Sequence, residues 1–502
     1  MKKSLLTIIF GVLVVFLSAQ ETSSGNCYYN DYLIWDDLGY PDVHGDCGNS
    51  DLFNTGEYLT IEMWVRAYSF GENRKLCGKL PPELQPGYVM GFQNLNVYTE
   101  VMNPATFSVV YPGTGPLPQD SAWVHLSVTY AYNGQLKEYI NGVLQGTSDI
   151  FPQNPIPAND APFIIGRAPW DYAFVYYGDI DEIRVWSSER TEAEINSYKH
   201  KQLNGDEPGL VAYYDFNNNQ DSVFFDQSPN GNNGVIKKYD QPCFWWETSY
   251  APVGDSMMYS MHDVQAAWFG KRNSQFNYID TLNGLTIIAD INDKEFRKYV
   301  VAGHNDSTGT TTENIPAVAP ADFKMLKTIW YVNKGGSFTS TLKFDLKENA
   351  APGDTLTLFQ PDSLYTLLKW DEILGEFYPL HSADLAYFDS EYYYVYFNNV
   401  QLSDGYYSLG QGSEKLADPA GVSEISRELL VEMYPNPADE LITVKNANGF
   451  ELSIIDLSGR TVMNKKIDSL IENTDISHLK SGFYLVRLTD KTNETIKKLI
   501  IK

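Results

Sequence analysis

The segment WVHLSVTYAYNGQLKEYINGVLQG (Trp123–Gly146) decides the expected fold. It contains two turn signals, Asn133-Gly134 and Asn141-Gly142, with the second starting eight residues after the first. Asn and Gly both tolerate positive φ, so Asn-Gly pairs favour tight hairpins between antiparallel strands. Turn signals at this spacing are typical of a β-sandwich or a barrel, and the segment therefore predicts consecutive antiparallel strands.

Two further runs support a β fold, YLTIEMWVRA (Tyr58–Ala67) and DEIRVWSSERT (Asp181–Thr191). In Tyr58–Ala67 apolar residues occupy every second position, and this period of two predicts a half-buried strand. The clear helical signal is the short run TEAEINSYKH (Thr191–His200). There Thr191 as N-cap and Glu194 three residues later predict a capping box.

Composition narrows the class of protein. The chain has 502 residues, which corresponds to roughly three domains of ordinary size. Its 37 basic and 64 acidic residues give a net charge of -27, which argues against binding to nucleic acid or to anionic lipid. Aromatic residues make up 14%, and together with 37 Gly and 25 Pro they favour an all-β fold with many turns.

The N-terminus, residues 1–20, has the features of a signal peptide. Lys2 and Lys3 provide a basic start, and the apolar run Leu5–Leu17 is too short for a comfortable membrane span. A retained N-terminal anchor is the alternative. We expect a mature protein that is soluble and lies outside the cytoplasm, with no membrane span.

Four cysteines, Cys27, Cys47, Cys77 and Cys243, lie in the first half of the chain. An even number in an exported chain predicts two disulfides, and four cysteines allow 3 connectivities. We expect Cys47 to pair with Cys77 and Cys27 with Cys243, although the sequence alone does not fix the pairing.

The chain divides by texture into three modules. Residues 27–243 and 251–412 are both rich in strand-like runs, and residues 413–428 form a linker with few apolar positions. Residues 429–502 form a compact strand-rich module. Within the second module, the polar stretch Gly303–Pro316 predicts a long loop.

The first module resembles the laminin-G-like, concanavalin-A-like jelly roll of bacterial surface proteins. The matching residues are YLTIEMWV, WVHLSVTYAYNGQLKEYINGVLQG, PFIIGRAP, GDIDEIRVWSSERTEAEI and EPGLVAYYDFNNNQDSVFFDQSPNGNNGVI. The resemblance implies two packed antiparallel sheets, a carbohydrate or protein ligand, and often a structural calcium ion.

The last module resembles the type A sorting domain of the type IX secretion system. The matching residues are YPNPADELITV, LSIIDLSGRTV, DISHLKSGFYLVRL and the terminal TIKKLIIK. The resemblance implies a small immunoglobulin-like sandwich, recognition by the type IX machinery, cleavage of the tail, and release or surface anchoring in a Bacteroidota-type bacterium. The middle module resembles a recurrent β-sandwich of such surface proteins, without an assigned activity.

An enzyme of the laminarinase type is the main catalytic alternative, because these hydrolases share the jelly-roll fold. Their catalytic strand reads E-x-D-x-x-E or E-x-D-x-E, which places the carboxylates on one face beside the scissile bond. Here Asp179 and Asp181 can share a face, but Ile183 and Arg184 occupy the positions of the third carboxylate. We therefore expect no catalytic residues in this strand.

The sequence also offers candidate residues for binding calcium and sugar. Calcium prefers carboxylate and carbonyl oxygens, and Asp181 and Asp226 are the predicted ligands of one structural ion. In the aromatic run before Gly178, flat rings can stack on sugars or fill a core. We take Trp170, Tyr172 and Tyr176 as the candidate ligand-binding residues.

These features predict an all-β protein made of a jelly roll, a second β-sandwich and a small sandwich for sorting. The favoured function is non-catalytic binding or adhesion at the cell surface or outside the cell, with a glycan or a surface protein as partner. A glycoside hydrolase or lyase with an atypical site is the alternative. A purely structural matrix component is a further one.

Overall fold

A computed structural model of the chain divides it into two compact units, Met1–Leu416 and Ala417–Lys502. It describes residues 26–30, 44–67, 73–82, 86–93, 96–103, 106–110, 122–148, 155–170, 174–176, 178–217, 222–237, 245–268, 275–280, 284–290, 298–347, 354–358, 361–388, 393–416, 432–434, 438–445, 450–456, 460–467, 471–489 and 494–501. The boundary between the units falls inside the expected linker at 413–428. The expected signal peptide, residues 1–20, lies outside the described residues.

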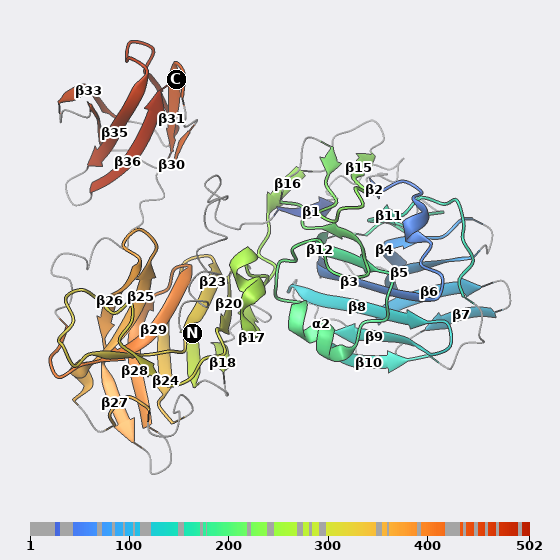
Figure 1. The fold of residues 1–502 in the computed structure, drawn as a ribbon. Coiled ribbons are helices and arrows are strands. Elements are labelled where there is room, and N and C mark those ends of the chain that lie inside the picture. Colours follow the sequence, from blue (N-terminus) through green and yellow to red (C-terminus); the bar gives the residue numbers. More distant parts are fainter. Residues whose placement is uncertain are drawn as a thin grey trace, which may run out of the picture. The chain divides into compact units, whose positions relative to one another are not determined.

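Two antiparallel sheets form the first half of the larger unit (Figure 1). Sheet 1 has the order β10 (Val143–Thr147), β9 (Leu136–Ile140), β8 (Val124–Ala131), β3 (Tyr58–Ala67), β12 (Gly178–Trp186), β1 (Asn26–Asn30) and β16 (Trp245–Thr248), and β13 (Leu210–Tyr214) also pairs with β12. Sheet 2 has the order β14 (Val223–Phe224), β15 (Gly234–Lys237), β2 (His44–Asp46), β11 (Ile164–Ile165), β4 (Asn73–Lys79), β5 (Gly87–Gln93), β6 (Asn96–Asn103) and β7 (Thr106–Val110).

A large apolar core lies between sheets 1 and 2. From β3 it receives Leu59, Ile61, Met63 and Val65, which is the alternation that the sequence predicted. The bounds of β3 are also those of the expected strand, Tyr58–Ala67. The opposite face of β3 is buried as well, because Thr60, Glu62 and Trp64 are each 0% exposed. Strand β3 is therefore covered on both faces, whereas the sequence predicted a half-buried strand.

The predicted turns and helix cap are present. Asn141 and Gly142 have φ values of 54° and 80° and join β9 to β10, as an Asn-Gly hairpin requires. The helix α2 (Glu192–Tyr198) begins with the expected capping box, in which Thr191 Oγ1 accepts from the N–H of Glu194 at 3.2 Å. The Glu194 carboxylate accepts in return from the N–H of Thr191 at 2.7 Å. In the part of the chain that the structure describes, short 3-10 helices lie at η1 (Asp51–Phe53), η2 (Ser256–Ser260) and η3 (Asp362–Leu364).

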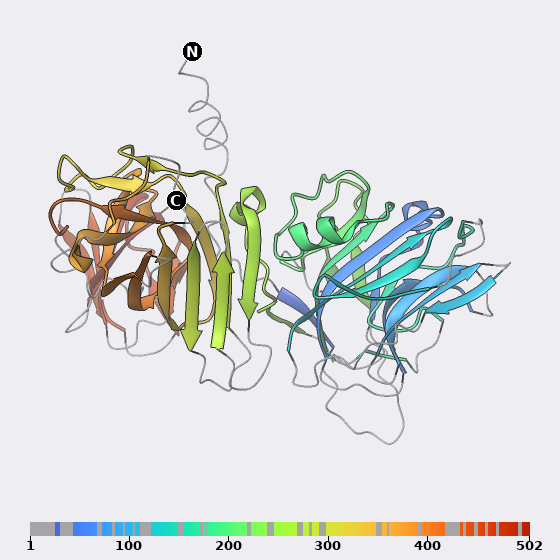
Figure 2. The ribbon, with the colours of Figure 1, turned by 90° about the horizontal axis from the view of Figure 1, so that it is seen from below.

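A second sandwich completes the larger unit; Figure 2 shows it in yellow and orange beside the blue-to-green layers of the jelly roll. Sheet 3 has the order β17 (His262–Trp268), β20 (Tyr299–His304), β23 (Trp330–Gly335), β29 (Gly405–Gln411), β22 (Lys324–Leu326) and β21 (Thr310–Thr311). On this sheet β25 (Tyr365–Asp371) pairs with β29 and with β26 (Glu376–Ser382). Sheet 4 has the order β18 (Gln275–Asp280), β19 (Leu285–Asp290), β24 (Thr339–Asp345), β28 (Tyr393–Gln401) and β27 (Leu385–Phe388). A separate apolar core fills this second sandwich.

Aromatic side chains join the two sandwiches. Trp268 of β17 lies edge-on to Trp64 of β3 at 5.5 Å between ring centroids, and its Nε1 donates to the carbonyl of Trp123 at 2.9 Å. Trp64 Nε1 donates to the carbonyl of Lys199 at 2.8 Å. These buried contacts explain why the two sandwiches form one compact unit.

The smaller unit contains two sheets around an aliphatic core. The first has the order β30 (Glu432–Tyr434), β31 (Leu441–Lys445) and β34 (Ile471–Asp475). The second has the order β33 (Thr461–Lys466), β32 (Glu451–Asp456), β35 (Gly482–Thr489) and β36 (Glu494–Ile501). The all-β expectation is confirmed in both units.

Candidate functional site

Strand β12 carries the acidic residues that the sequence singled out, and a β-bulge determines where they point. Asp181 pairs with Trp64 of β3, and Arg184 pairs with Glu62, so two residues of β12 oppose one of β3. Glu182, in the bulge, has a φ of 54°. Ile183 consequently turns into the core, while Asp181 and Arg184 lie on the face of sheet 1 that points away from sheet 2, which we call its outer face.

Asp181 is buried beside the segment that leads into the second sandwich. Its Oδ1 accepts from the N–H of Glu182 at 2.8 Å, and the hydroxyl of Ser249 is a further hydrogen-bond partner. Burial raises the pKa of Asp181 well above its ordinary value, and the nearby Glu182 carboxylate adds to this rise. The carboxyl group is thus held in an environment that favours its protonated form.

Glu182 and Arg184 form a buried ion pair that ties β12 to the segment after α2. Arg184 Nη2 lies 2.7 Å from Glu182 Oε2, and the Tyr213 hydroxyl donates to the same oxygen at 2.8 Å. The guanidinium also donates to the carbonyl oxygens of Tyr198 at 2.9 Å and Lys201 at 2.6 Å. Arg184 therefore has a structural role at the position where a hydrolase would carry a carboxylate.

Asp179 is paired in a similar way. Its carboxylate forms an ion pair with the guanidinium of Arg66 on the neighbouring strand β3. Asp179 is 0% exposed, and all nine residues of β12 are buried. The strand that resembles a catalytic strand therefore offers no carboxylate to a polymer in solvent.

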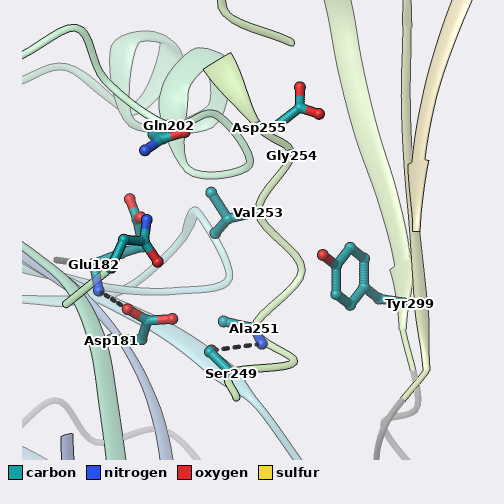
Figure 3. A pocket seen from close by; sticks show the side chains of 10 residues that line it. Asp181, Glu182, Gln202, Ser249, Ala251, Val253, Gly254, Asp255 and Tyr299 are labelled. Carbon is teal, nitrogen blue, oxygen red and sulfur yellow. Dashed lines mark hydrogen bonds between the residues drawn. The ribbon is translucent and has the colours of Figure 1, made fainter. Parts of the chain in front are cut away.

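A small polar cavity of about 30 Å³ lies where the two sandwiches meet. Figure 3 shows Asp181 and Ser249 on one side of it and Tyr299 of β20 on the other. Its lining consists of Asp181, Glu182, Gln202, Asn217, Ser249, Ala251, Val253, Gly254, Asp255 and Tyr299. This volume suits a water molecule, whereas pockets for larger ligands are about ten times larger.

Further carboxylates approach this cavity from other segments. Asp255 accepts from the hydroxyl of Tyr331 at 2.6 Å, and Asp215 accepts from the N–H of Asn217 at 3.2 Å. Burial raises the pKa of both carboxyls. Sequence reasoning missed this convergence, since residues 181, 215 and 255 belong to separate segments and no local pattern connects them.

The two predicted calcium ligands have different surroundings. Asp226 accepts from the N–H groups of Tyr213, Ser228 and Asn232 at 2.9, 2.9 and 2.8 Å and from the Ser228 hydroxyl at 2.9 Å. This carboxylate organises its loop and has few lone pairs left for a cation. Across the described part of the chain, no three His, Cys, Asp or Glu side chains are arranged to hold a metal ion. The donor set does not fit one ion shared by Asp181 and Asp226, and calcium stays a prediction.

The structure corrects one of the predicted ligand-binding residues. Tyr176 is 0% exposed, packs in the core at 5.9 Å from the ring of Phe92, and is closed to a ligand. Trp170 is half-buried and packs on Leu80, Val89 and Met102. Tyr172 lies outside the described residues. Several aromatic residues lie close together in the sequence before Gly178, and this pattern alone does not distinguish rings in the core from rings on the surface.

The expected disulfide between Cys47 and Cys77 is wrong, since both are buried free thiols. Strand β11 lies between β2, which ends next to Cys47, and β4, which contains Cys77. Two strand spacings are roughly 9–10 Å, beyond the Cα separation of about 7 Å that a disulfide tolerates. Cys243 lies outside the described residues, so its pairing with Cys27 stays a prediction.

The second residue group that sequence reasoning missed is the junction around His200. His200 Nδ1 lies 2.7 Å from the carbonyl oxygen of Pro252, and Lys201 Nζ donates to the carbonyl of Met261 at 2.7 Å. Burial lowers the pKa of His200 to about 3, with the neighbouring Lys199 charge acting in the same direction. A neutral imidazole is therefore part of the contact between the sandwiches.

Comparison with known families identifies both end modules. Residues 44–196 match the family described as "Concanavalin A-like lectin/glucanases superfamily". Residues 432–502 match the family described as "Secretion system C-terminal sorting domain". The chain therefore carries a concanavalin A-like domain and a type IX sorting domain, as both resemblances implied. The sorting domain directs export to the cell surface or the extracellular space.

Two curated relatives match short stretches. Beta-agarase D of Zobellia galactanivorans is 30% identical over 71 residues, which is 14% of this chain and 14% of the relative. An endo-acting ulvan lyase of Formosa agariphila is 36% identical over 76 residues, which is 14% of this chain and 15% of the relative. The chain thus spans only about one seventh of these relatives.

Among solved structures, the Ruminococcus gnavus IT-sialidase CBM40 bound to alpha2,3 sialyllactose is similar to part of the chain. It is 17% identical, covers 28% of this chain and 83% of its own, and has a TM-score of 0.25. A TM-score of 0.25 is too low to support an inference about function. No helix in the described residues has the length and apolar character needed to span a membrane.

Proposed function

We propose that this exported protein is a non-catalytic binding or adhesion protein whose concanavalin A-like domain recognises carbohydrate or a surface partner. The complete burial of β12 carries the proposal. A glycosidase needs two carboxyl groups in contact with the scissile bond. Here Asp179 and Glu182 are engaged by Arg66 and Arg184, and Asp181 faces a cavity too small for a sugar.

The candidate binding residue Trp170 lies on the face of sheet 2 that points away from sheet 1. Val97 and Val101 of β6 face the core, so the alternate residues Tyr98, Glu100 and Met102 lie on the other side. Trp170 packs on Met102 there and is half-buried, whereas Tyr98, Glu100 and Met102 are each 7% exposed. The exposed part of this indole is suited to stacking on a sugar ring.

Charged groups accompany this indole on the same face. Lys75 Nζ lies 3.7 Å from the centroid of the Tyr98 ring and 3.4 Å from Glu100 Oε1. Burial lowers the pKa of Lys75 to about 8. Lys75 is 1% exposed and Tyr98 and Glu100 are each 7% exposed, so these groups are closed to a ligand, and Trp170 is the residue that we propose for the sugar contact.

The names of the curated relatives support polysaccharide as the ligand class, since one is an agarase and the other an ulvan lyase. Because both relatives are enzymes, an enzyme acting on polysaccharide is the second candidate function. The raised pKa values of Asp181, Glu182 and Asp255 are of the kind found in general acids. The cavity of about 30 Å³ argues against a sugar reaching them.

A glycan array with the mature protein tests the proposal. We expect selective binding to one class of glycan, and we expect Trp170→Ala to weaken it while Ile373→Ala, at a side chain 95% exposed on the other sandwich, leaves it unchanged. Reducing-sugar release from agar, ulvan and other polysaccharides is measured in parallel. Release that disappears in Asp181→Asn, with the fold intact, would establish the enzyme instead.

A further inference from the structure

The second sandwich, which has no assigned activity, carries a row of aromatic side chains on the solvent side of sheet 4. Tyr393, Val395 and Phe397 of β28 face its core, so Tyr394 and Tyr396 point the other way. On the edge strand β27, Tyr387 pairs with Tyr394 and Leu385 pairs with Tyr396. Strands β24, β28 and β27 thus place these residues side by side (Figure 1).

These rings are accessible. Tyr387 is 51% exposed and Leu385 is 46% exposed, and Tyr394 and Tyr396 are half-buried. Tyr394 and Tyr396 are 6.2 Å apart between ring centroids, at an interplanar angle of 66°. We name Leu385, Tyr387, Tyr394 and Tyr396 the tyrosine platform. The described core of the second sandwich does not contain it, so packing between the sheets does not account for it.

Polar groups border the tyrosine platform on the next strand, β24. Lys343 pairs with Tyr396, and its ammonium group lies 4.2 Å from the centroid of the Tyr394 ring. Thr341 Oγ1 donates to Asn398 Oδ1 at 3.1 Å, which orients the amide so that its Nδ2 can donate to a ligand. Flat rings beside hydroxyl, amide and ammonium donors match the alternating apolar and polar faces of a saccharide.

The charge pattern selects among saccharides. Lys343 places its ammonium group on this face, and the carboxylates of two described acids near it accept backbone N–H groups, Asp345 from Lys347 and Asp384 from Asn398. The charge of distant parts of the chain is screened over about 10 Å, so an anionic group in direct contact with Lys343 interacts most strongly with its ammonium group. We propose that the tyrosine platform binds acidic polysaccharide, with sugar rings on the tyrosines and a carboxylate or sulfate on Lys343.

Isothermal titration of the mature chain with a tetramer of galacturonate tests this proposal, with cellotetraose as the neutral probe. We expect the uronate tetramer to bind more tightly than cellotetraose. Tyr387→Ala and Tyr396→Ala should each weaken it about five- to tenfold, as the loss of one aromatic contact implies. Lys343→Gln should weaken it and remove most of its dependence on salt.

The control is Ile373→Ala, which removes a side chain that is 95% exposed, on the hairpin between β25 and β26 of the same sandwich. Thermal melts establish that each variant is folded. Unchanged affinity in both tyrosine variants, equal binding of the neutral probe, or no binding by the native protein overturns the proposal. So does a dimer in light scattering that Tyr387→Ala dissociates, because the platform would then be an interface between copies.

Discussion

The two compact units of the chain differ in what they bury. In Met1–Leu416 the outer face of sheet 1 encloses charged side chains, among them Glu62, Asp181 and Arg184. In the described part of Ala417–Lys502 the buried polar side chains are Ser453 and Thr474, and neither is charged. The larger unit therefore depends on ion pairs that must be complete, while the smaller one depends on aliphatic packing.

The distribution of charge follows the same division. The sorting module, residues 429–502, contains ten basic and ten acidic residues, so the whole net charge of -27 belongs to the rest of the chain. Among the described groups of the smaller unit, Asp475 has a pKa lowered by hydrogen bonds from Ser477, which gives that unit one reason to respond to acid. An acidic unit with carboxyls and histidines inside its fold has several.

Removing the smaller unit gives the largest expected effect. A chain that ends at Arg427 should keep the fold of the larger unit, because the division between compact units lies at Leu416. The same chain should lose export to the surface, since residues 432–502 form the sorting domain. Cell fractionation and a thermal melt of the truncated protein measure the two results; delivery at the native level would contradict the first.

Breaking the buried ion pair is the next largest effect. Arg184→Ala leaves Glu182 buried without its cation, which should reduce the free energy of unfolding of the larger unit by about 3–5 kcal/mol. Leu488→Ala, in the core of the smaller unit, should cost that unit about 2–5 kcal/mol by creating a cavity. Denaturant titration should show each variant moving only the transition of its own unit. A loss below 1 kcal/mol for Arg184→Ala would mean that the ion pair is dispensable.

Acid should weaken the larger unit through His200. The pKa of His200 in the folded chain is about 3, below the ordinary value of 6.5. Between these two values the unfolded chain binds a proton at His200 and the folded chain does not. Stability present above pH 6.5 is then lost as the pH falls toward 3, by about 1.4 kcal/mol per pH unit. His200→Asn keeps a donor for the Pro252 carbonyl and should flatten this slope in melts from pH 7 to pH 4.5. The transition of the smaller unit serves as the internal control.

Replacing Asp181 should have the smallest effect. Its raised pKa means that ionisation costs more in the folded state, so this carboxyl lowers stability as the pH rises above its ordinary range. Asp181→Asn should change the free energy of unfolding by about 1 kcal/mol or less at pH 5. Toward pH 8 the variant should become more stable relative to the native protein. Melts with calcium and with a chelator extend the test. A calcium-dependent stabilisation that the variant lacks would establish Asp181 as a calcium ligand.

Much of the fold follows from local sequence. The period of two in Tyr58–Ala67 predicts β3, Asn141-Gly142 predicts the hairpin between β9 and β10, and Thr191 predicts the cap of α2. Each of these signals depends on residues within a few positions of one another. The all-β class and the two end modules could therefore be predicted.

The site could be predicted only in part, because it depends on contacts between distant segments. Nothing local indicates the bulge at Glu182, which turns Ile183 into the core and leaves Asp181 and Arg184 on the same face. The burial of the polar face of β3 comes from α2 and from Trp268, which is far away in the sequence. Proximity of Cys47 and Cys77 along the sequence likewise says nothing of the intervening β11.

The last strand of the larger unit, β29, occupies an interior position in sheet 3. It pairs with β22, β23 and β25, so strands that precede it in the sequence have no complete sheet until residues 405–411 arrive. The second sandwich can therefore close only after residues 405–411, shortly before the sorting module in the chain, are free to pair. Completion of the second sandwich thereby depends on the segment nearest the sorting module, because the order of strands in the sheet differs from their order in the chain.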